Sequence, residues 1–279
     1  MEFIEILKAI FLGIVEGITE WLPISSTGHM ILFDEFVKLN ISPEFKELFF
    51  VVIQLGAILA VPVFFFEKLN PFSRKKSEAE KKSTWSLWYK VVVGALPAAI
   101  IGFLLDDFFD KYFYKYYVVA IALIVYGIAF ILVERKKKGK SFRVESVDEL
   151  SYKDALMIGT FQVLALIPGT SRSGSTILGG MLGGVSRTAS AEFSFFMAIP
   201  IMLGASFLKI VKFVTEGFVA TNTEIAVLLI GIVVSFLVSL FAIKFLMDFV
   251  KRHDFKPFGI YRIALGIAVL GYFVIKSLL

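Results

Sequence analysis

Six stretches of about 20 residues, rich in apolar and poor in charged side chains, constrain this chain more than any other feature. The hydrocarbon core of a bilayer is about 30 Å thick, and a helix of about 20 apolar residues can cross it. Apolar residues make up 57% of the sequence and the mean hydropathy is +0.80, which predicts an all-α integral membrane protein. The predicted spans cover residues 48–66, 89–105, 116–133, 189–211, 225–247 and 258–279.

The segments between these stretches differ in their content of lysine and arginine. Residues 67–88, 134–153 and 251–257 carry most of the cationic side chains of a chain whose net charge is +5. Loops with such an excess face the cytoplasm in multi-pass proteins, so these three segments are predicted to be cytoplasmic. Basic runs can also bind nucleic acid, but solvated loops near anionic lipid are the simpler interpretation, and no nucleic-acid partner is predicted.

A polar string occurs twice in this apolar sequence. The first copy covers residues 13–29 (GIVEGITEWLPISSTGH) and the second covers residues 159–176 (GTFQVLALIPGTSRSGST). One constant shift along the chain places Glu16 on Gln162, Ser25 on Ser171 and Gly28 on Gly174. Polar and ionisable groups are costly inside a membrane, so both strings are predicted to belong to a functional site.

The repeat divides a single membrane domain, residues 1–279, into two halves. Each string is followed by three predicted spans, so residues 153–279 enter the membrane from the side opposite to residues 1–133. We therefore predict a polytopic helical bundle of two inverted-topology repeats, related by a pseudo-two-fold axis in the membrane plane. The two strings then come from opposite faces and can meet inside the bilayer.

Each string is predicted to form a re-entrant helix pair, over residues 3–38 and 154–186. Pro23 and Pro168 interrupt the helices, and the serine and threonine residues that follow are good N-caps for a second helix. Such a turn presents free N–H groups and the positive end of a helix dipole, which suits a bound phosphate. The candidate phosphate ligands are Ser25, Thr27, Ser171, Arg172, Ser173, Gly174 and Thr176.

Glu16 and Glu20 are four residues apart and are predicted to share one helix face. A buried pair of carboxylates can bind a divalent cation, or one of them can serve as a proton acceptor. A solvated helix face is the alternative, and it fits the apolar surroundings less well.

Ser26 is a candidate nucleophile because Glu20 and His29, either of which could act as its base, are nearby in the sequence. Serine residues here are also ordinary helix caps, and a lone histidine is more often structural than catalytic. The second histidine, His253, is predicted to be an exposed surface residue in the basic segment 251–257.

Two arginines stand out in the apolar part of the chain. The guanidinium of Arg172 matches the geometry of a phosphate, and burying it in a membrane is costly without an anionic partner. A structural salt bridge with Glu16 or Glu20 is the alternative, and both roles are compatible if the pair loosens when substrate arrives. Arg262, near the start of the last span, can extend along the helix to the membrane interface or reach the polar cavity, and the first arrangement is the preferred prediction.

The two strings closely resemble the signature motifs of the undecaprenyl-diphosphate phosphatase family, the bacitracin-resistance proteins of bacteria. The resemblance rests on residues 16–29 (EGITEWLPISSTGH) and 168–176 (PGTSRSGST), and it extends to residues 52–60, 180–187 and 191–195. It covers essentially the whole chain.

The resemblance implies a hydrolase of the bacterial plasma (inner) membrane, whose site opens toward the outer face. It would remove the terminal phosphate of undecaprenyl diphosphate and return undecaprenyl phosphate to cell-wall synthesis, which gives bacitracin resistance. It also implies a divalent cation, Mg²⁺ or Ca²⁺. On the matching positions, Glu16 and Glu20 form the acidic motif, Ser26 and His29 belong to the hydroxyl-histidine stretch, and Arg172 binds phosphate.

Several alternatives stay open at the level of sequence. Phosphoryl transfer needs mainly charge stabilisation and in-line positioning, so either Ser26 or an activated water could attack. Inverted repeats with broken helices are also typical of transporters, so a carrier of phosphorylated lipid or anions is the alternative function. Small-residue helix faces make a homodimer plausible.

Overall fold

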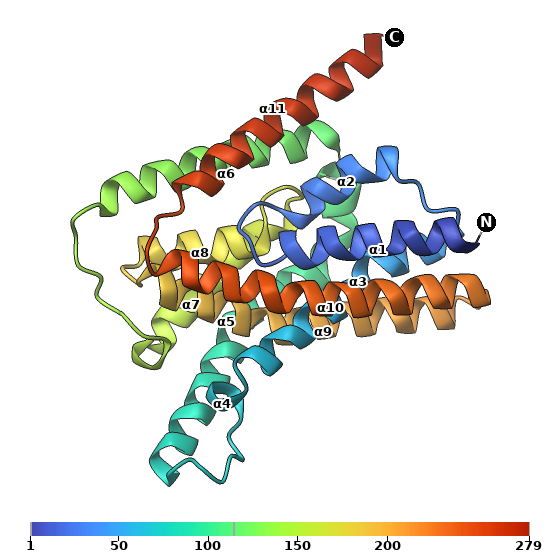
Figure 1. Ribbon diagram of the computed structural model, residues 1–279. Helices are drawn as coiled ribbons and strands as arrows, with labels where there is room; N and C mark the ends of the chain where they lie inside the picture. Colours follow the sequence, from blue (N-terminus) through green and yellow to red (C-terminus); the bar gives the residue numbers. More distant parts are fainter. Residues whose placement is uncertain (1, 114, 279) are drawn as a thin grey trace.

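The computed structural model describes residues 2–113 and 115–278, which form a bundle of helices (Figure 1). Within these residues there is no β-strand, and a single isolated bridge joins Val144 to Val185. The α-helices are α1 (Glu2–Thr19), α2 (Ser26–Phe36), α3 (Pro43–Phe64), α4 (Phe66–Leu69), α5 (Glu78–Phe113), α6 (Tyr116–Lys137), α7 (Tyr152–Val163), α8 (Arg172–Leu182), α9 (Arg187–Thr215), α10 (Asn222–Val250) and α11 (Lys256–Leu278). Two 3₁₀ turns, η1 (Val147–Glu149) and η2 (Leu164–Leu166), flank α7.

Six of the described helices are long and apolar enough to cross a membrane, which confirms the predicted number. They are α3, α5 as far as Leu105, α6, α9, α10 and α11. The chain is therefore a multi-pass membrane protein. The helix that holds the second span begins before the predicted start of that span: Ser77 and Glu80 cap α5, and its first residues, 78–82, are mostly charged.

Close helix packing fixes the place of α11 against α6, which lie side by side in Figure 1. A Cβ atom on Gly127 would lie 2.6 Å from the Gly259 carbonyl oxygen, and one on Gly259 would lie 2.7 Å from the Gly127 carbonyl oxygen. Only glycine permits this approach of two backbones. Helix α1 packs on α10 in the same way, through Gly13 and Gly17.

A buried ion pair ties together three helix ends on the side of the predicted cytoplasmic segments. Arg187, at the start of α9, donates from Nε and Nη2 to the Glu134 carboxylate of α6, over 2.8 and 2.5 Å. Glu134 also accepts the backbone N–H of Phe255, just before α11, over 2.9 Å. The start of α11 is thus held in place before its first apolar turns.

Candidate functional site

Each polar string forms a tight turn between two helices. The first turn (residues 20–25) separates α1 from α2, and the second turn (residues 167–171) separates η2 from α8. Ser25 has φ 75° and Ser171 has φ 72°, a left-handed conformation that costs a non-glycine residue about 1–3 kcal/mol. No other described residue except glycine has a positive φ.

The strained serines cap the helices that follow them. Ser25 Oγ accepts the Gly28 N–H over 3.2 Å, and Ser171 Oγ accepts the Gly174 N–H over 3.1 Å. The two serines thus share a left-handed conformation and the same capping hydrogen bond at equivalent positions of the two strings. Each leaves a helix N-terminus with unsatisfied N–H groups, which can bind an anion.

The two turns are joined by a chain of polar contacts centred on Glu20. Arg172 Nη2 donates to Glu20 Oε1 over 2.9 Å, and Ser26 Oγ donates to Glu20 Oε2 over 2.8 Å. The Glu20 side chain is 7% exposed and the Arg172 side chain 12% exposed, so solvent screens this ion pair little. Glu20, one of the candidate bases, is therefore in contact with both the candidate nucleophile Ser26 and the candidate phosphate ligand Arg172.

The remaining donors of Arg172 are held by α9 and by the first turn. Nη1 donates to the Ser194 carbonyl oxygen over 2.7 Å and to Ser194 Oγ over 3.2 Å. The guanidinium lies 5.6 Å from the centre of the Trp21 ring, a cation–π contact. Nε is the exception among the donors of Arg172: it is buried and has no hydrogen-bond partner.

The other predicted phosphate ligands surround this pair, but most of their hydroxyls already contact protein atoms. Ser173 Oγ donates to the Glu20 carbonyl oxygen over 3.2 Å, and Thr176 Oγ1 lies 2.7 Å from Ser194 Oγ. Ser25 and Ser171 act as caps, and Gly174 donates to Ser171. Thr27, like Ser26, Ser171 and Arg172, is only partly buried.

His29 does not contact Ser26 through a hydrogen bond; its ring nitrogens have other partners. Nδ1 lies 2.7 Å from the Ser25 carbonyl oxygen, and Nε2 lies 2.7 Å from the Tyr261 hydroxyl of α11. Of the two candidate bases, Glu20 is thus the one that accepts the Ser26 hydrogen bond. His253 is exposed, as predicted.

The prediction that Arg262 reaches the membrane interface is wrong, because this side chain is fully buried at the site. Nη1 donates to the Pro23 carbonyl oxygen of the first turn over 3.1 Å. Nη2 donates to the backbone carbonyl oxygens of Gly169 and Thr170, in the second turn, over 2.9 and 2.8 Å. Backbone carbonyls provide partial negative charge for the guanidinium, so Arg262 connects both turns without a carboxylate.

We expect Arg262→Lys to destabilise the protein by about 3 kcal/mol, because an ammonium cannot reach all these carbonyls and buried acceptors would lose their partners. The thermal midpoint in detergent should fall by roughly 5–10 °C. Arg252→Lys, at an exposed position of the turn before α11, is the matched control and should leave the midpoint unchanged. An unchanged midpoint in Arg262→Lys would contradict the buried placement.

Glu16 offers a polar atom without a protein partner. Its side chain is buried beside the Glu20–Arg172 pair, and Oε1 accepts no hydrogen bond. Among the side chains that the structure describes, which leave out residues 34, 35, 106, 107 and 110, no group of three or more His, Asp or Glu could hold a metal by itself. Mg²⁺ is commonly bound by one or two carboxylates together with substrate phosphates, so Glu16 and Glu20 fit a cation that arrives with a diphosphate.

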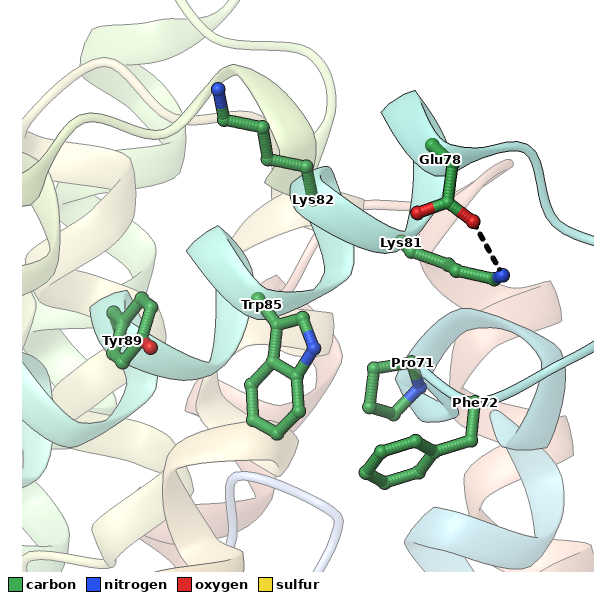
Figure 2. Close-up of a pocket in the computed structure, with 7 residues that line it drawn as sticks. All are labelled: Pro71, Phe72, Glu78, Lys81, Lys82, Trp85 and Tyr89. Carbon is green, nitrogen blue, oxygen red and sulfur yellow. Dashed lines mark hydrogen bonds and ion pairs between the residues drawn. The ribbon is translucent and has the colours of Figure 1, made fainter.

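A surface cavity of about 720 Å³ lies elsewhere, at the start of α5. Figure 2 shows its aromatic and charged lining, with Lys81 paired to Glu78. None of its lining residues belongs to the two strings, so the cavity is separate from the candidate site.

Sequence reasoning did not assign a role to two residues of the site. Ser194 lies within an apolar helix, and Tyr261 lies in the last span; the partners of both come from distant segments. In the sequence, only the resemblance of segment 191–195 to the family indicated that Ser194 could belong to the site.

Comparisons with known proteins agree with the geometry. Residues 9–268 match a family model described as bacitracin resistance protein BacA. The chain is 57% identical to an undecaprenyl-diphosphatase of Enterococcus faecalis over 98% of this chain and 99% of the relative. It is 57% identical to an undecaprenyl-diphosphatase of Desulfitobacterium hafniense over the full length of both chains. It is 59% identical to an undecaprenyl-diphosphatase of Acetivibrio thermocellus over 97% of this chain and 98% of the relative.

Proposed function

The chain belongs to the bacitracin resistance protein BacA family, and we propose that it hydrolyses undecaprenyl diphosphate at the site formed by Glu20, Ser26 and Arg172. The products are undecaprenyl phosphate and inorganic phosphate. The activity recycles the lipid carrier of cell-wall synthesis and underlies bacitracin resistance. The observation that carries the assignment is the contact between the two turns, in which Glu20 binds both the hydroxyl of Ser26 and the guanidinium of Arg172.

Substrate binding would begin with an exchange of partners at Arg172. The diphosphate approaches the unused Nε and the N-termini of α2 and α8, while the prenyl tail stays in lipid or in an apolar groove. Phosphate oxygens then compete with Glu20 for the Arg172 fork. Glu20 loses its counter-ion and becomes free to accept a proton.

The hydrogen bond between Ser26 and Glu20 favours a phosphoserine pathway. Ser26 Oγ attacks the terminal phosphorus; its O–H bond breaks, the proton passes to Glu20 Oε2, and the bridging P–O bond of the diphosphate breaks. Water then cleaves the phosphoserine and releases inorganic phosphate. Direct attack by a water molecule activated by Glu20 or His29 is the alternative.

Ser26→Ala separates these pathways. We expect phosphate release to fall by about 10³-fold or more, because the nucleophile is lost while Glu20 and Arg172 remain. Labelling with undecaprenyl [β-³²P]diphosphate and rapid quenching should trap a phosphoenzyme in the unchanged protein and none in the variant. Turnover of the variant near that of the unchanged protein would rule out Ser26 as the nucleophile.

Glu16 and Glu20 would hold a divalent cation, Mg²⁺ or Ca²⁺, together with the diphosphate oxygens. When bound, this cation supplies positive charge that offsets the negative charge of the phosphates. Support comes from the unpartnered Oε1 of Glu16 beside the acidic motif.

The arrangement of the turns supports an inverted-topology repeat in the plasma membrane. Glu2, at the start of α1, accepts a hydrogen bond from Thr223 at the start of α10, whereas Asp154, near the start of α7, pairs with Arg143 of the basic segment 134–153. The helix pairs α1–α2 and α7–α8 would thus be re-entrant from opposite faces. With the basic segments in the cytoplasm, α1 and α2 open to the outer face.

Phosphate release from undecaprenyl diphosphate by the purified protein, with and without chelator, tests the proposal directly. Release that depends on a divalent cation and fails in the Glu20 and Arg172 variants supports the site. No release from folded protein would favour a carrier that binds lipid phosphate at the same two turns. Size measurement in detergent tests the separate prediction of a homodimer.

A further inference from the structure

Helices α2 and α11 meet at His29 and Tyr261. The two rings are stacked, with centroids 5.6 Å apart and an angle of 5° between their planes. The Tyr261 hydroxyl lies 2.7 Å from His29 Nε2. Because the rings are parallel and the polar atoms are in contact, the position of the imidazole depends directly on this tyrosine.

The other contact of His29 defines which ring nitrogen carries the proton. Nδ1 lies 2.7 Å from the Ser25 carbonyl oxygen, which can only accept a hydrogen bond. Nδ1 of the neutral ring therefore carries the hydrogen, and Nε2 presents a lone pair. The Tyr261 O–H donates to that lone pair, so both contacts select the same tautomer.

The tyrosine is partly exposed, whereas the histidine that it contacts is buried. The His29 residue is 4% exposed, whereas Tyr261 is 45% exposed. The neighbouring Arg262 is fixed by carbonyl groups of both turns, so the backbone at position 261 is held in place. His29 in turn contacts the carbonyl oxygen of Ser25, the residue that caps α2 and precedes Ser26.

We propose that Tyr261 is a positioning residue for the hydrolysis: its O–H donates to Nε2 and holds the His29 ring in the Nδ1–H tautomer, so that Nδ1–H keeps the Ser25 carbonyl oxygen, and with it the start of α2 at Ser26, in place. The inference rests on the proposed function, in which Ser26, the residue that follows Ser25, is the attacking group. Without the hydroxyl, Nε2 has no partner within the protein, and the ring can change its tautomer or its orientation. The Ser26–Glu20 contact does not include Tyr261, so substrate binding through Arg172 is preserved.

The tautomer can be measured independently of activity, because the chain has only two histidines. In a His253→Asn background, protein labelled with ¹⁵N-histidine reports His29 alone, at a pH where the ring is neutral. We expect one protonated Nδ1 and one unprotonated Nε2 signal. Tyr261→Phe should give averaged or mixed tautomer signals. A single unchanged Nδ1–H tautomer in Tyr261→Phe would overturn the proposal.

Steady-state kinetics provide a second test of the proposal. Tyr261→Phe should lower kcat by about tenfold, the factor expected for one hydrogen bond, with KM changed less than about twofold. Tyr272→Phe is the matched control: it lies on the same helix and its ring packs against Phe36 of α2, so it should keep full activity. An equal loss in both variants would indicate general damage to the contact between α2 and α11, which contradicts the proposal.

A double-mutant cycle with His29→Gln tests whether the tyrosine acts through the histidine. If it does, Tyr261→Phe should cause little further loss in the His29→Gln background. A full tenfold further loss would overturn the proposal. Failure of the unchanged protein to release phosphate would instead refute the proposed function, and the NMR measurement would still decide the tautomer.

Discussion

Replacing Arg172 with lysine is expected to lower kcat/KM by about 10³-fold, equivalent to about 4 kcal/mol of transition-state stabilisation. The guanidinium contacts Glu20, Ser194 and the Trp21 ring at once. Its planar set of N–H donors can exchange the Glu20 carboxylate for phosphate oxygens as acceptors. An ammonium keeps the charge but cannot maintain this set of contacts. Initial rates of phosphate release over a range of substrate concentrations provide the measurement.

The matched control for this variant is Arg187→Lys. Arg187 also forms a buried pair with a glutamate, Glu134, but at the ends of α6 and α9 and outside the two strings. The Arg187→Lys substitution should lower the thermal midpoint and leave kcat/KM of the folded protein nearly unchanged. If both variants lose activity equally, Arg172 has no special role in phosphate binding.

Glu20→Gln should reduce kcat by about 10²–10⁴-fold, the range expected when a general base is removed. The amide is nearly the same size as the carboxylate, so the fold of the first turn should persist. It cannot accept the Ser26 proton, and it no longer neutralises Arg172 in the free protein. For this reason, phosphate should bind as tightly as before or more tightly in the presence of a chelator, where no cation contributes to binding, while turnover with the cation present is lost.

Glu5→Gln is the control on the same helix, since Glu5 is also buried and paired with a cation, Lys8. Its rate of phosphate release should stay within about twofold of the unchanged protein. Turnover of Glu20→Gln at the unchanged rate would show that Glu20 accepts no proton in the reaction.

Local signals in the sequence predicted the parts of the site that local structure creates. Pro23 and Pro168 are each followed by serines that are suitable helix caps, so the turns follow from nearby residues, whereas Pro62, Pro97 and Pro200 lie inside helices. The six spans follow from length and hydropathy in the same way. The conformation of Ser25 and Ser171 was not predicted, because a positive φ at serine is uncommon.

Arg262 shows why the remaining contacts could not be predicted. Its acceptors are backbone carbonyls, which every residue has, and they lie in turns far away in the sequence. One signal was available: Gly259, Arg262 and Gly266 lie on one face of α11, and the glycines allow close packing against α6. That face is buried, and so is the arginine on it.

The position of Arg262 in the chain also has a consequence for biosynthesis. The carbonyl groups of Pro23, Gly169 and Thr170 acquire their shared partner only after the ribosome has made residue 262 and α11 has been inserted. Until then, the two turns have already entered the membrane without the group that holds them together. The contacts by which Arg262 joins the two turns are therefore completed only after α11 has been made.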